Sequence, residues 1–271
     1  MNSKDFFKLS NGVEIPAVGF GTWQIPAGET AYISVMSALK SGYRHIDTAL
    51  AYGNEASVGQ AIRDSGINRN EIFVTSKLPA EVKNYAIAHR YAEKTMKNIG
   101  LDYIDLYLIH APWPWNEIGA DYTKQNIQIW KAMEEFYETG KTRSIGISNF
   151  NVSDINAILE TCRIRPMVNQ IKFHIGHGQM EIREHCANND ILVEGYSPLA
   201  TGRILDNHDV GAIAKKYNKT VAQLSIRYVL QKGALPLPKS THPDYIRQNL
   251  DIDFDIAEED MKFLDGLKAA V

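Results

Sequence analysis

Four side chains that suit acid–base chemistry stand at or just beyond the ends of consecutive apolar segments. Asp47 ends the segment YRHID, and Tyr52 follows it shortly afterwards. Lys77 ends IFVTSK, and His110 ends IDLYLIH. A buried Asp, Lys or His is costly when it stands alone, whereas such groups can satisfy one another where they converge. Their joint occurrence on consecutive segments therefore favours a single acid–base site.

Each of these residues also has a structural explanation when it is taken singly. Asp47 could cap a helix or belong to an ion pair in the core, and Lys77 could extend from the rim into solvent. A lone histidine such as His110 is more often a hydrogen-bonded structural residue, and Tyr52 in a loop would usually serve packing. The four together make an acid–base site the better interpretation.

The four residue types have a common chemical use. A tyrosine hydroxyl has an ordinary pKa of about 10, and a buried ammonium beside it lowers that pKa by favouring the phenolate. A carboxylate keeps the ammonium charged, and a histidine near the tyrosine can hydrogen-bond a substrate oxygen. We therefore predict a proton donor for an oxygen that gains negative charge, as a carbonyl oxygen does when its carbon accepts hydride.

Eight short apolar segments are typical of strands and would position these residues. They begin roughly 25 to 40 residues apart, which is the size of one βα unit. The predicted strands are Ala17–Thr22, Tyr43–Asp47, Ile72–Lys77, Ile104–His110, Ser144–Ser148, Met167–Ile171, Ile191–Tyr196 and Ala234–Pro238.

Amphipathic stretches between these segments indicate helices. Gly42 suits the end of the first helix, and Asn54 is of the type that caps the second. The predicted helices are Glu29–Lys40, Asn54–Ser65, Val82–Ile99, Gln125–Glu138, Val152–Glu160, Met180–Asn188, Val210–Tyr217, Val221–Gln231 and Glu258–Lys268. Ahead of the first strand, FFKLSNGVEIP predicts a β-hairpin with its turn at Asn11-Gly12.

Strict alternation of strands and helices implies a parallel sheet. Eight such units in 271 residues predict a (β/α)8 TIM barrel with an N-terminal β-hairpin, in one domain over residues 1–271. The rival is an open doubly wound sheet, which would need a glycine-rich phosphate loop after the first strand. Gly19-Phe20-Gly21 is only a fragment of such a loop, because Gln24 stands where the third glycine belongs. The barrel also explains the polar strand ends, since its active site lies there.

Composition excludes several other classes of function. The formal net charge of −3 offers no basic field for nucleic acid. No apolar run reaches the ~18 residues that a membrane helix needs, and MNSKDFFKLSNG lacks the apolar region of a signal peptide. Cys162 and Cys186 are too few for a disulfide framework. We expect a cytoplasmic protein that binds neither membrane nor nucleic acid.

Three segments resemble signatures of the aldo-keto reductase family. GYRHIDTALAYGNEASVG contains both Asp47 and Tyr52 and resembles the first signature. GKTRSIGISNF resembles the second, and LPKSTHPDYIRQN resembles the third. The similarity runs from Leu9 to about Phe254, nearly the whole chain. The length and short C-terminus look most like bacterial members of the 2,5-diketo-gluconate reductase type.

The resemblance implies a function and a role for each site residue. It implies NAD(P)H-dependent reduction of small carbonyl compounds by a monomer, with Tyr52 as general acid, Lys77 and Asp47 tuning it, and His110 orienting the carbonyl. The implied contacts with the nicotinamide are Ser148, Asn149 and Gln170 on its carboxamide and Tyr196 stacked on its ring. Ser197 and Leu199 are implied at the pyrophosphate, and Lys239, Ser240, Tyr245, Gln248 and Asn249 at the adenosine end. Thr22 and Trp23 are further implied cofactor contacts. Implied substrate contacts are Trp23, Tyr52, His110, Ala111 and Trp113.

Two places depart from the family pattern. Tyr245 stands where the family usually has an arginine for the adenine and the 2′-phosphate, and Gln248 stands where an acidic residue is common. Lys239 is retained, so we expect NADPH to be favoured while NADH is also usable. Ala111 replaces an aromatic residue that many members carry, and we expect it to widen one side of the pocket.

Other functions predict different residue patterns. A Y-x-x-x-K pair, Tyr137 and Lys141, lacks the nucleotide loop of a short-chain dehydrogenase. His174 and His177 have no companion ligands at metal-site spacing, so we expect no metal. A metal-dependent barrel hydrolase or isomerase would need ligands on several strand ends. The alternative from another class is a non-catalytic nicotinamide-binding barrel with a regulatory or structural role.

Overall fold

The sheet at the centre of the structure is closed. The computed structural model describes residues 1–267, in which eight parallel strands pair in sequence order. The amides of Gly19 and Gly21 donate hydrogen bonds to the carbonyls of Pro236 (3.1 Å) and Pro238 (3.0 Å), which joins the first strand of this sheet to the last. The strands are β3 (Phe20–Gly21), β4 (His45–Asp47), β5 (Phe73–Leu78), β6 (Leu106–Ile109), β7 (Ile145–Ser148), β8 (Val168–Lys172), β9 (Leu192–Tyr196) and β10 (Leu235–Leu237).

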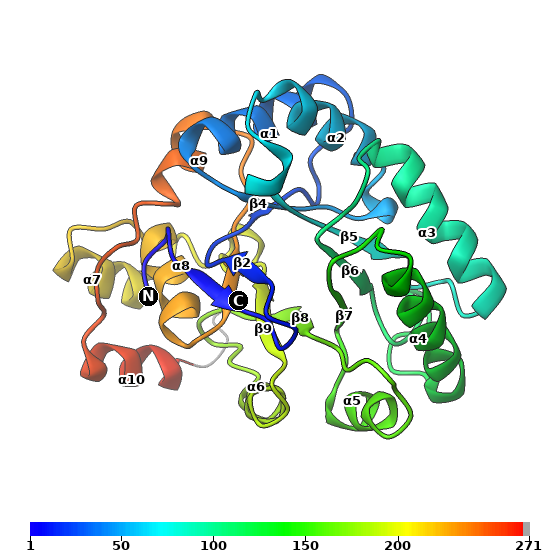
Figure 1. The fold of residues 1–271 in the computed structure, drawn as a ribbon. Helices are drawn as coiled ribbons and strands as arrows, with labels where there is room; N and C mark the ends of the chain where they lie inside the picture. The colour runs from blue at the N-terminus through cyan, green and yellow to red at the C-terminus, as the bar shows by residue number, and fades with distance from the viewer. Residues whose placement is uncertain (268–271) are drawn as a thin grey trace.

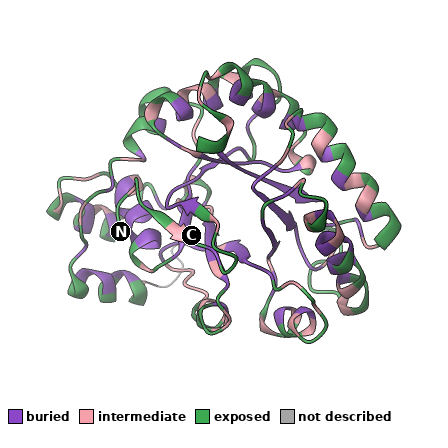
Figure 2. Cartoon of the chain, viewed as in Figure 1, coloured by how far each residue is buried: buried purple, intermediate pink, exposed green. Residues whose placement is uncertain are grey.

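The helices surround this sheet, as the ribbon in Figure 1 shows. Their inward faces and the strands are buried, and their outward faces are exposed (Figure 2), which is the amphipathic arrangement expected for a barrel. They are α1 (Glu29–Ser41), α2 (Glu55–Asp64), α3 (Tyr85–Ile99), α4 (Thr123–Glu138), α5 (Val152–Leu159), α6 (Met180–Ala187), α7 (His208–Lys216), α8 (Val221–Gln231), α9 (Pro243–Gln248) and α10 (Glu258–Gly266).

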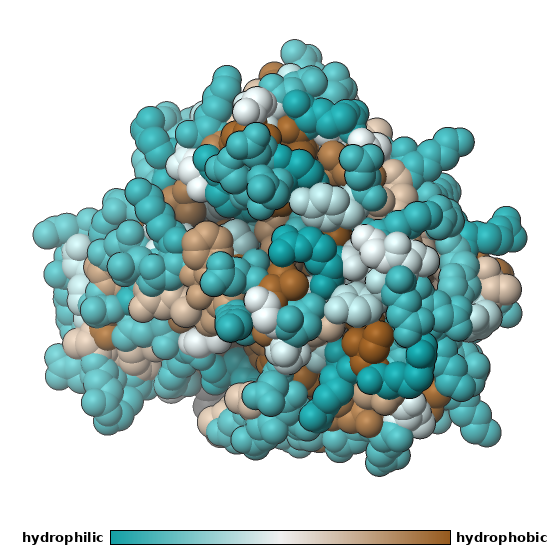
Figure 3. Space-filling model, viewed as in Figure 1, coloured by the Kyte–Doolittle hydropathy of each residue, from teal (hydrophilic) through white to brown (hydrophobic). Residues whose placement is uncertain are grey.

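An antiparallel hairpin lies across one end of the barrel (Figure 1). Its strands are β1 (Phe6–Lys8) and β2 (Glu14–Pro16), and Gly12 in the turn has φ of 87°, which favours glycine. Asn11 Nδ2 donates to the carbonyl of Arg143 (2.9 Å), just before β7 begins. The hairpin therefore covers the N-terminal ends of the strands, a mostly hydrophilic face in Figure 3.

The structure confirms the predicted TIM barrel and its hairpin. Each predicted strand and helix is present with boundaries that shift by a few residues, and Gly42 ends α1 in the left-handed conformation. The predicted last helix extended to Lys268, which lies outside the described residues. The short helix α9 was not predicted.

Asn54 precedes α2, as expected, but its side chain does not cap the helix. It instead donates to the carbonyls of Thr22 and Ile25 (both 3.0 Å) and accepts from Thr48 Oγ1 (2.8 Å). It thus ties the ends of two neighbouring strands together, beside the residues discussed next. Among the helices of residues 1–267, none is long and apolar enough to cross a membrane.

Candidate active site

A buried ion pair joins the ends of β4 and β5. Lys77 Nζ donates to both carboxylate oxygens of Asp47 (2.7 and 2.8 Å) and to the carbonyl of Thr48 (2.9 Å). The lysine side chain is fully buried. Burial lowers its pKa, but the Asp47 carboxylate and Tyr52 outweigh that effect, and the pKa of Lys77 lies above its ordinary value. The lysine is therefore a fixed positive charge at the strand ends.

The Tyr52 hydroxyl lies 3.3 Å from Lys77 Nζ, at the end of the 3-10 turn Leu50–Tyr52 that follows β4. Burial raises its pKa above 10, the Lys77 charge acts in the opposite direction, and Asp47 raises it again. The net direction is upward, so the expectation of a lowered Tyr52 pKa was wrong. Desolvation of the phenolate exceeds the attraction of a lysine whose charge Asp47 already balances. The hydroxyl therefore keeps its proton at neutral pH.

His110 follows β6 and faces Tyr52. The two rings meet edge to face with their centroids 5.5 Å apart. Burial, with a smaller contribution from the Lys77 charge, lowers the pKa of His110 to about 3. The imidazole is therefore neutral and has one N–H to donate. The backbone carbonyl of His110 accepts a hydrogen bond from Asn149 Nδ2 (2.9 Å), which fixes the strand end.

A second carboxyl group lies behind the ion pair. Gln170 Nε2 donates to Asp47 Oδ2 (2.9 Å) and to Glu194 Oε2 (2.7 Å), so both of its amide hydrogens are used. Glu194 is fully buried, and burial together with the Asp47 charge raises its pKa to about 8. Sequence reasoning did not single out Glu194. The available signal was one acidic residue within the apolar strand ILVEGY.

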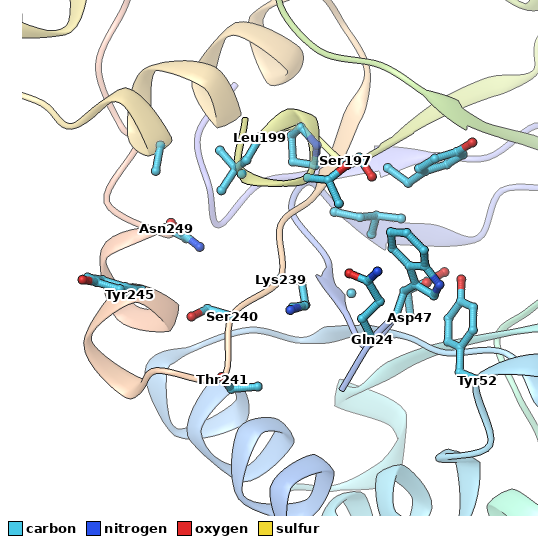
Figure 4. A pocket seen from close by; sticks show the side chains of 18 of the residues that line it. Gln24, Asp47, Tyr52, Ser197, Leu199, Lys239, Ser240, Thr241, Tyr245 and Asn249 are labelled. Atoms are coloured by element: carbon cyan, nitrogen blue, oxygen red, sulfur yellow. The ribbon is translucent and has the colours of Figure 1, made fainter. Parts of the chain in front are cut away.

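These groups open into one long cavity of about 1090 Å³ at the C-terminal ends of the strands. In Figure 4, Asp47 and Tyr52 lie at one end of the view, Tyr245 and Asn249 lie towards the other, and Lys239 lies between them. Predicted residues that line it are Trp23, Asp47, Tyr52, His110, Ser148, Asn149, Gln170, Tyr196, Ser197, Leu199, Lys239, Ser240, Tyr245, Gln248 and Asn249.

Two of the remaining predicted contacts lie behind the wall of the cavity. Thr22 is buried, and its hydroxyl donates to the Asp47 carbonyl (2.9 Å), so it braces β3 against β4. Ala111 is also fully buried and does not line the cavity. The Ala111 side chain therefore forms no part of the cavity wall.

A tryptophan that the sequence did not single out contributes to the wall. Trp115 lines the cavity and meets His110 edge to face, with the ring centroids 5.4 Å apart. Trp113 contacts Trp115 at 5.2 Å rather than lining the cavity itself. The signal was present as Trp-Pro-Trp, but an irregular loop gives no periodicity that tells which ring faces inward.

Four of the eight non-glycine residues with positive φ in residues 1–267 line the cavity. The non-glycine residues with left-handed φ include Gln24 (61°), Asn149 (63°), Ser197 (52°) and Thr201 (61°), and all four line it. Such conformations cost free energy and persist where the surrounding structure holds them, which is often a binding site.

The residues present suit a nicotinamide dinucleotide. Such a ligand is long, with an aromatic base at one end, anionic phosphates in the middle and an amide-bearing ring at the other. The cavity offers the Tyr245 ring beside His242 at one end, the ammonium of Lys239, and the side-chain amides of Asn149 and Gln170 near Tyr52. In residues 1–267, no three His, Cys, Asp or Glu side chains gather as a metal site would require.

Comparison with known proteins agrees with this geometry. A family model described as "Aldo/keto reductase family" matches residues 17–269. The chain is 44% identical to glyoxal reductase of Bacillus subtilis over 265 residues, covering 97% of this chain and 93% of that protein. It is 41% identical to the 9,11-endoperoxide prostaglandin H2 reductase of Trypanosoma cruzi, covering 96% and 90%.

Solved structures give the same result. The crystal structure of an aldo/keto reductase from Brucella melitensis superposes with a TM-score of 0.89 at 38% identity, covering 96% of this chain and 98% of that one. The aldose reductase of Schistosoma japonicum has a TM-score of 0.89 at 36% identity, covering 96% and 91%.

Proposed function

The chain belongs to the aldo/keto reductase family, and from that premise we propose that it reduces small aldehydes and ketones to alcohols with a nicotinamide cofactor. The observation that carries the proposal is the Tyr52 hydroxyl at the cavity wall, 3.3 Å from a lysine that is itself paired with buried Asp47. A proton donor backed by a fixed positive charge is what carbonyl reduction requires.

The proposed proton donor is Tyr52. When bound, the reduced nicotinamide supplies the hydride that adds to the carbonyl carbon. The carbonyl oxygen gains negative charge as that bond forms, and the Tyr52 hydroxyl gives it a proton, which completes the alcohol. The ammonium of Lys77 stabilises the tyrosinate that is left, and the Asp47 carboxylate holds the ammonium in place.

His110 has the proposed task of orienting the carbonyl. Its pKa of about 3 makes it a neutral donor, so it can hydrogen-bond the oxygen without competing with Tyr52 as an acid. Trp23 and Trp115 would form the aromatic walls around the substrate. With the substrate enclosed between these rings, water would be kept from the reacting groups.

The cofactor would lie along the cavity. Gln170 would accept from the nicotinamide carboxamide through Oε1, because Asp47 and Glu194 occupy both of its amide hydrogens. Asn149 and Ser148 would also contact the carboxamide. The remaining contacts would run along the cavity from the nicotinamide to the adenosine. These are Tyr196 and Trp23 at the nicotinamide, Ser197 and Leu199 at the pyrophosphate, and Lys239, Ser240, Tyr245, Gln248 and Asn249 at the adenosine.

NADPH is the proposed preferred cofactor, with NADH as a usable second. Lys239 and Ser240 can meet a 2′-phosphate with one charged and one neutral donor. Tyr245 is 58% exposed and offers a ring that can cover the adenine, but not the paired donors of an arginine.

The test is Tyr52→Phe, which removes only the transferable proton. We expect kcat to fall by about 10²- to 10⁴-fold while the Kd for NADPH stays unchanged. Tyr91→Phe, on the outer helix α3, is the matched control and should leave kcat unchanged. A Tyr52→Phe variant that keeps more than about half of the wild-type kcat, with chemistry rate-limiting, would rule out this acid. NADPH binding without turnover of any aldehyde in a broad panel would favour the non-catalytic alternative.

A further inference from the structure

Three consecutive carbonyls in the loop after β6 are held by side chains from three other parts of the chain. Asn149 Nδ2 donates to the carbonyl of His110 (2.9 Å), and Lys83 Nζ donates to that of Ala111 (2.9 Å). Asn126 Nδ2 donates to the carbonyl of Pro112 (2.8 Å). The loop has two prolines, which lack the N–H that a regular turn would use. Between residues 110 and 112 these side chains therefore hold the backbone in place.

Two of these side chains act as one unit. Lys83 Nζ also donates to Asn126 Oδ1 (3.0 Å), so the ammonium ties the loop carbonyl and the α4 amide together. Lys83 lies between β5 and α3, whereas Asn126 lies in the first turns of α4. The pair, which we call the 83/126 clamp, thus fixes the loop to two separate parts of the barrel.

The clamped loop carries the aromatic wall of the cavity. Trp115 remains 40% exposed, so the core does not hold it in place. Its aromatic contacts are with His110 (ring centroids 5.4 Å apart) and Trp113 (5.2 Å), and all three residues belong to this loop. The position of the Trp115 ring over the cavity therefore depends on the backbone path from 110 to 115.

We infer that Lys83 is a positioning residue for the substrate: with Asn126, it holds the loop so that Trp115 walls the carbonyl end of the cavity. This inference rests on the proposed function. The clamp lies on the substrate side and touches none of the residues at the adenosine end. Loosening it should weaken binding of carbonyl compounds that pack on Trp115 and leave the cofactor unaffected.

The chemistry of Lys83 supports this role. Burial lowers its pKa to about 8, with Glu81 and Asp154 acting in the opposite direction. At neutral pH the amine is mostly an ammonium, whose hydrogen bonds to carbonyls are stronger than those of a neutral donor. Burying an ammonium costs free energy unless its donors are satisfied. Lys83 donates to a loop carbonyl and to an amide oxygen of α4, and these two hydrogen bonds fix the loop.

The experiment compares Lys83→Met with Lys83→Arg and with Lys131→Met, which removes an exposed charge from α4. For Lys83→Met we expect the KM of an aromatic aldehyde to rise roughly tenfold, with a smaller change for a two-carbon aldehyde. The Kd for NADPH should stay unchanged. Lys83→Arg should restore most of the loss, and Lys131→Met should match the wild type.

Hydrogen exchange provides a readout that needs no turnover. Amides in residues 111–122 should exchange roughly tenfold faster in Lys83→Met, whereas the other rim loops should not change. Unchanged KM together with unchanged hydrogen exchange would overturn the inference. It would also be overturned if NADPH binding weakened as much as aldehyde binding and if protection from exchange were lost in every loop. If Lys83→Met does not fold, Asn126→Asp keeps the acceptor for Lys83 but removes the donor to Pro112. If the wild type has no reductase activity, the proposed function is wrong. Hydrogen exchange would still test whether the 83/126 clamp holds the loop.

Discussion

Replacing Glu194 with glutamine should change how stability depends on pH. Glu194 is fully buried on β9, and its Oε1 has no hydrogen-bond partner among residues 1–267. Burial, then the nearby Asp47 charge, raises its pKa from 4.5 to about 8. The folded protein therefore holds this proton over a range of pH in which the unfolded chain releases it.

The sign and size of the effect follow from linkage. The contribution of Glu194 to stability is full below pH 4.5 and is lost progressively as pH rises towards about 8. At about 1.4 kcal/mol per pKa unit, the loss is on the order of 4 kcal/mol across that window. Glutamine resembles the protonated side chain in shape and cannot ionise, so Glu194→Gln should abolish this part of the pH dependence.

Denaturant unfolding at pH 5, 6.5 and 8 measures the difference. We expect wild type and Glu194→Gln to have similar free energies of unfolding at pH 5, and the variant to be the more stable by up to about 4 kcal/mol at pH 8. Glu184→Gln, on the exposed face of α6, is the matched control and should follow the wild type. Parallel profiles for wild type and Glu194→Gln would show that Glu194 is already ionised at neutral pH in the folded protein.

Three further changes test the site. Lys77→Met should lower kcat by about 100-fold or more and reduce the free energy of unfolding by about 3–5 kcal/mol, because Asp47 is left buried without its partner; a pH–rate profile of unchanged height and shape would contradict this. Tyr245→Arg should tighten NADPH by about one to two orders of magnitude in Kd and leave NADH nearly unchanged, whereas an equal gain for both would show that residue 245 does not meet the phosphate. Trp115→Ala should raise KM for aromatic aldehydes while the Kd for NADPH holds, and unchanged KM values would remove Trp115 from the substrate wall.

Much of the site could be predicted because its residues lie at the ends of regular strands. Asp47, Lys77 and His110 end consecutive strands, and parallel strands bring their ends to one rim. The alternation that defines those strands is a local property of the sequence, so the barrel follows from it. The two explanations offered for Asp47 are separated only by the structure, which places the carboxylate against Lys77.

The rest depends on context that the sequence does not express. Glu194 is the middle one of three consecutive buried residues of β9, so pattern alone does not tell which of them enters the barrel interior. Trp115 and Ala111 lie in a proline-rich loop without periodicity, and α9 is too short to give a helical pattern. The predicted direction of the Tyr52 pKa shift was wrong for a related reason. Neighbouring charged residues can be identified from the sequence, whereas the degree of desolvation cannot.

The bonds that close the sheet link β3 and β10, which lie near opposite ends of the chain. A growing polypeptide therefore exposes two unpaired sheet edges until β10 has been made, and such edges favour association with other chains. Lys239 and Ser240 follow shortly after β10, so the segment that closes the ring also lines the cavity. A ligand that binds there only when the ring is closed would, by mass action, oppose reopening of the seam between the first and last strands.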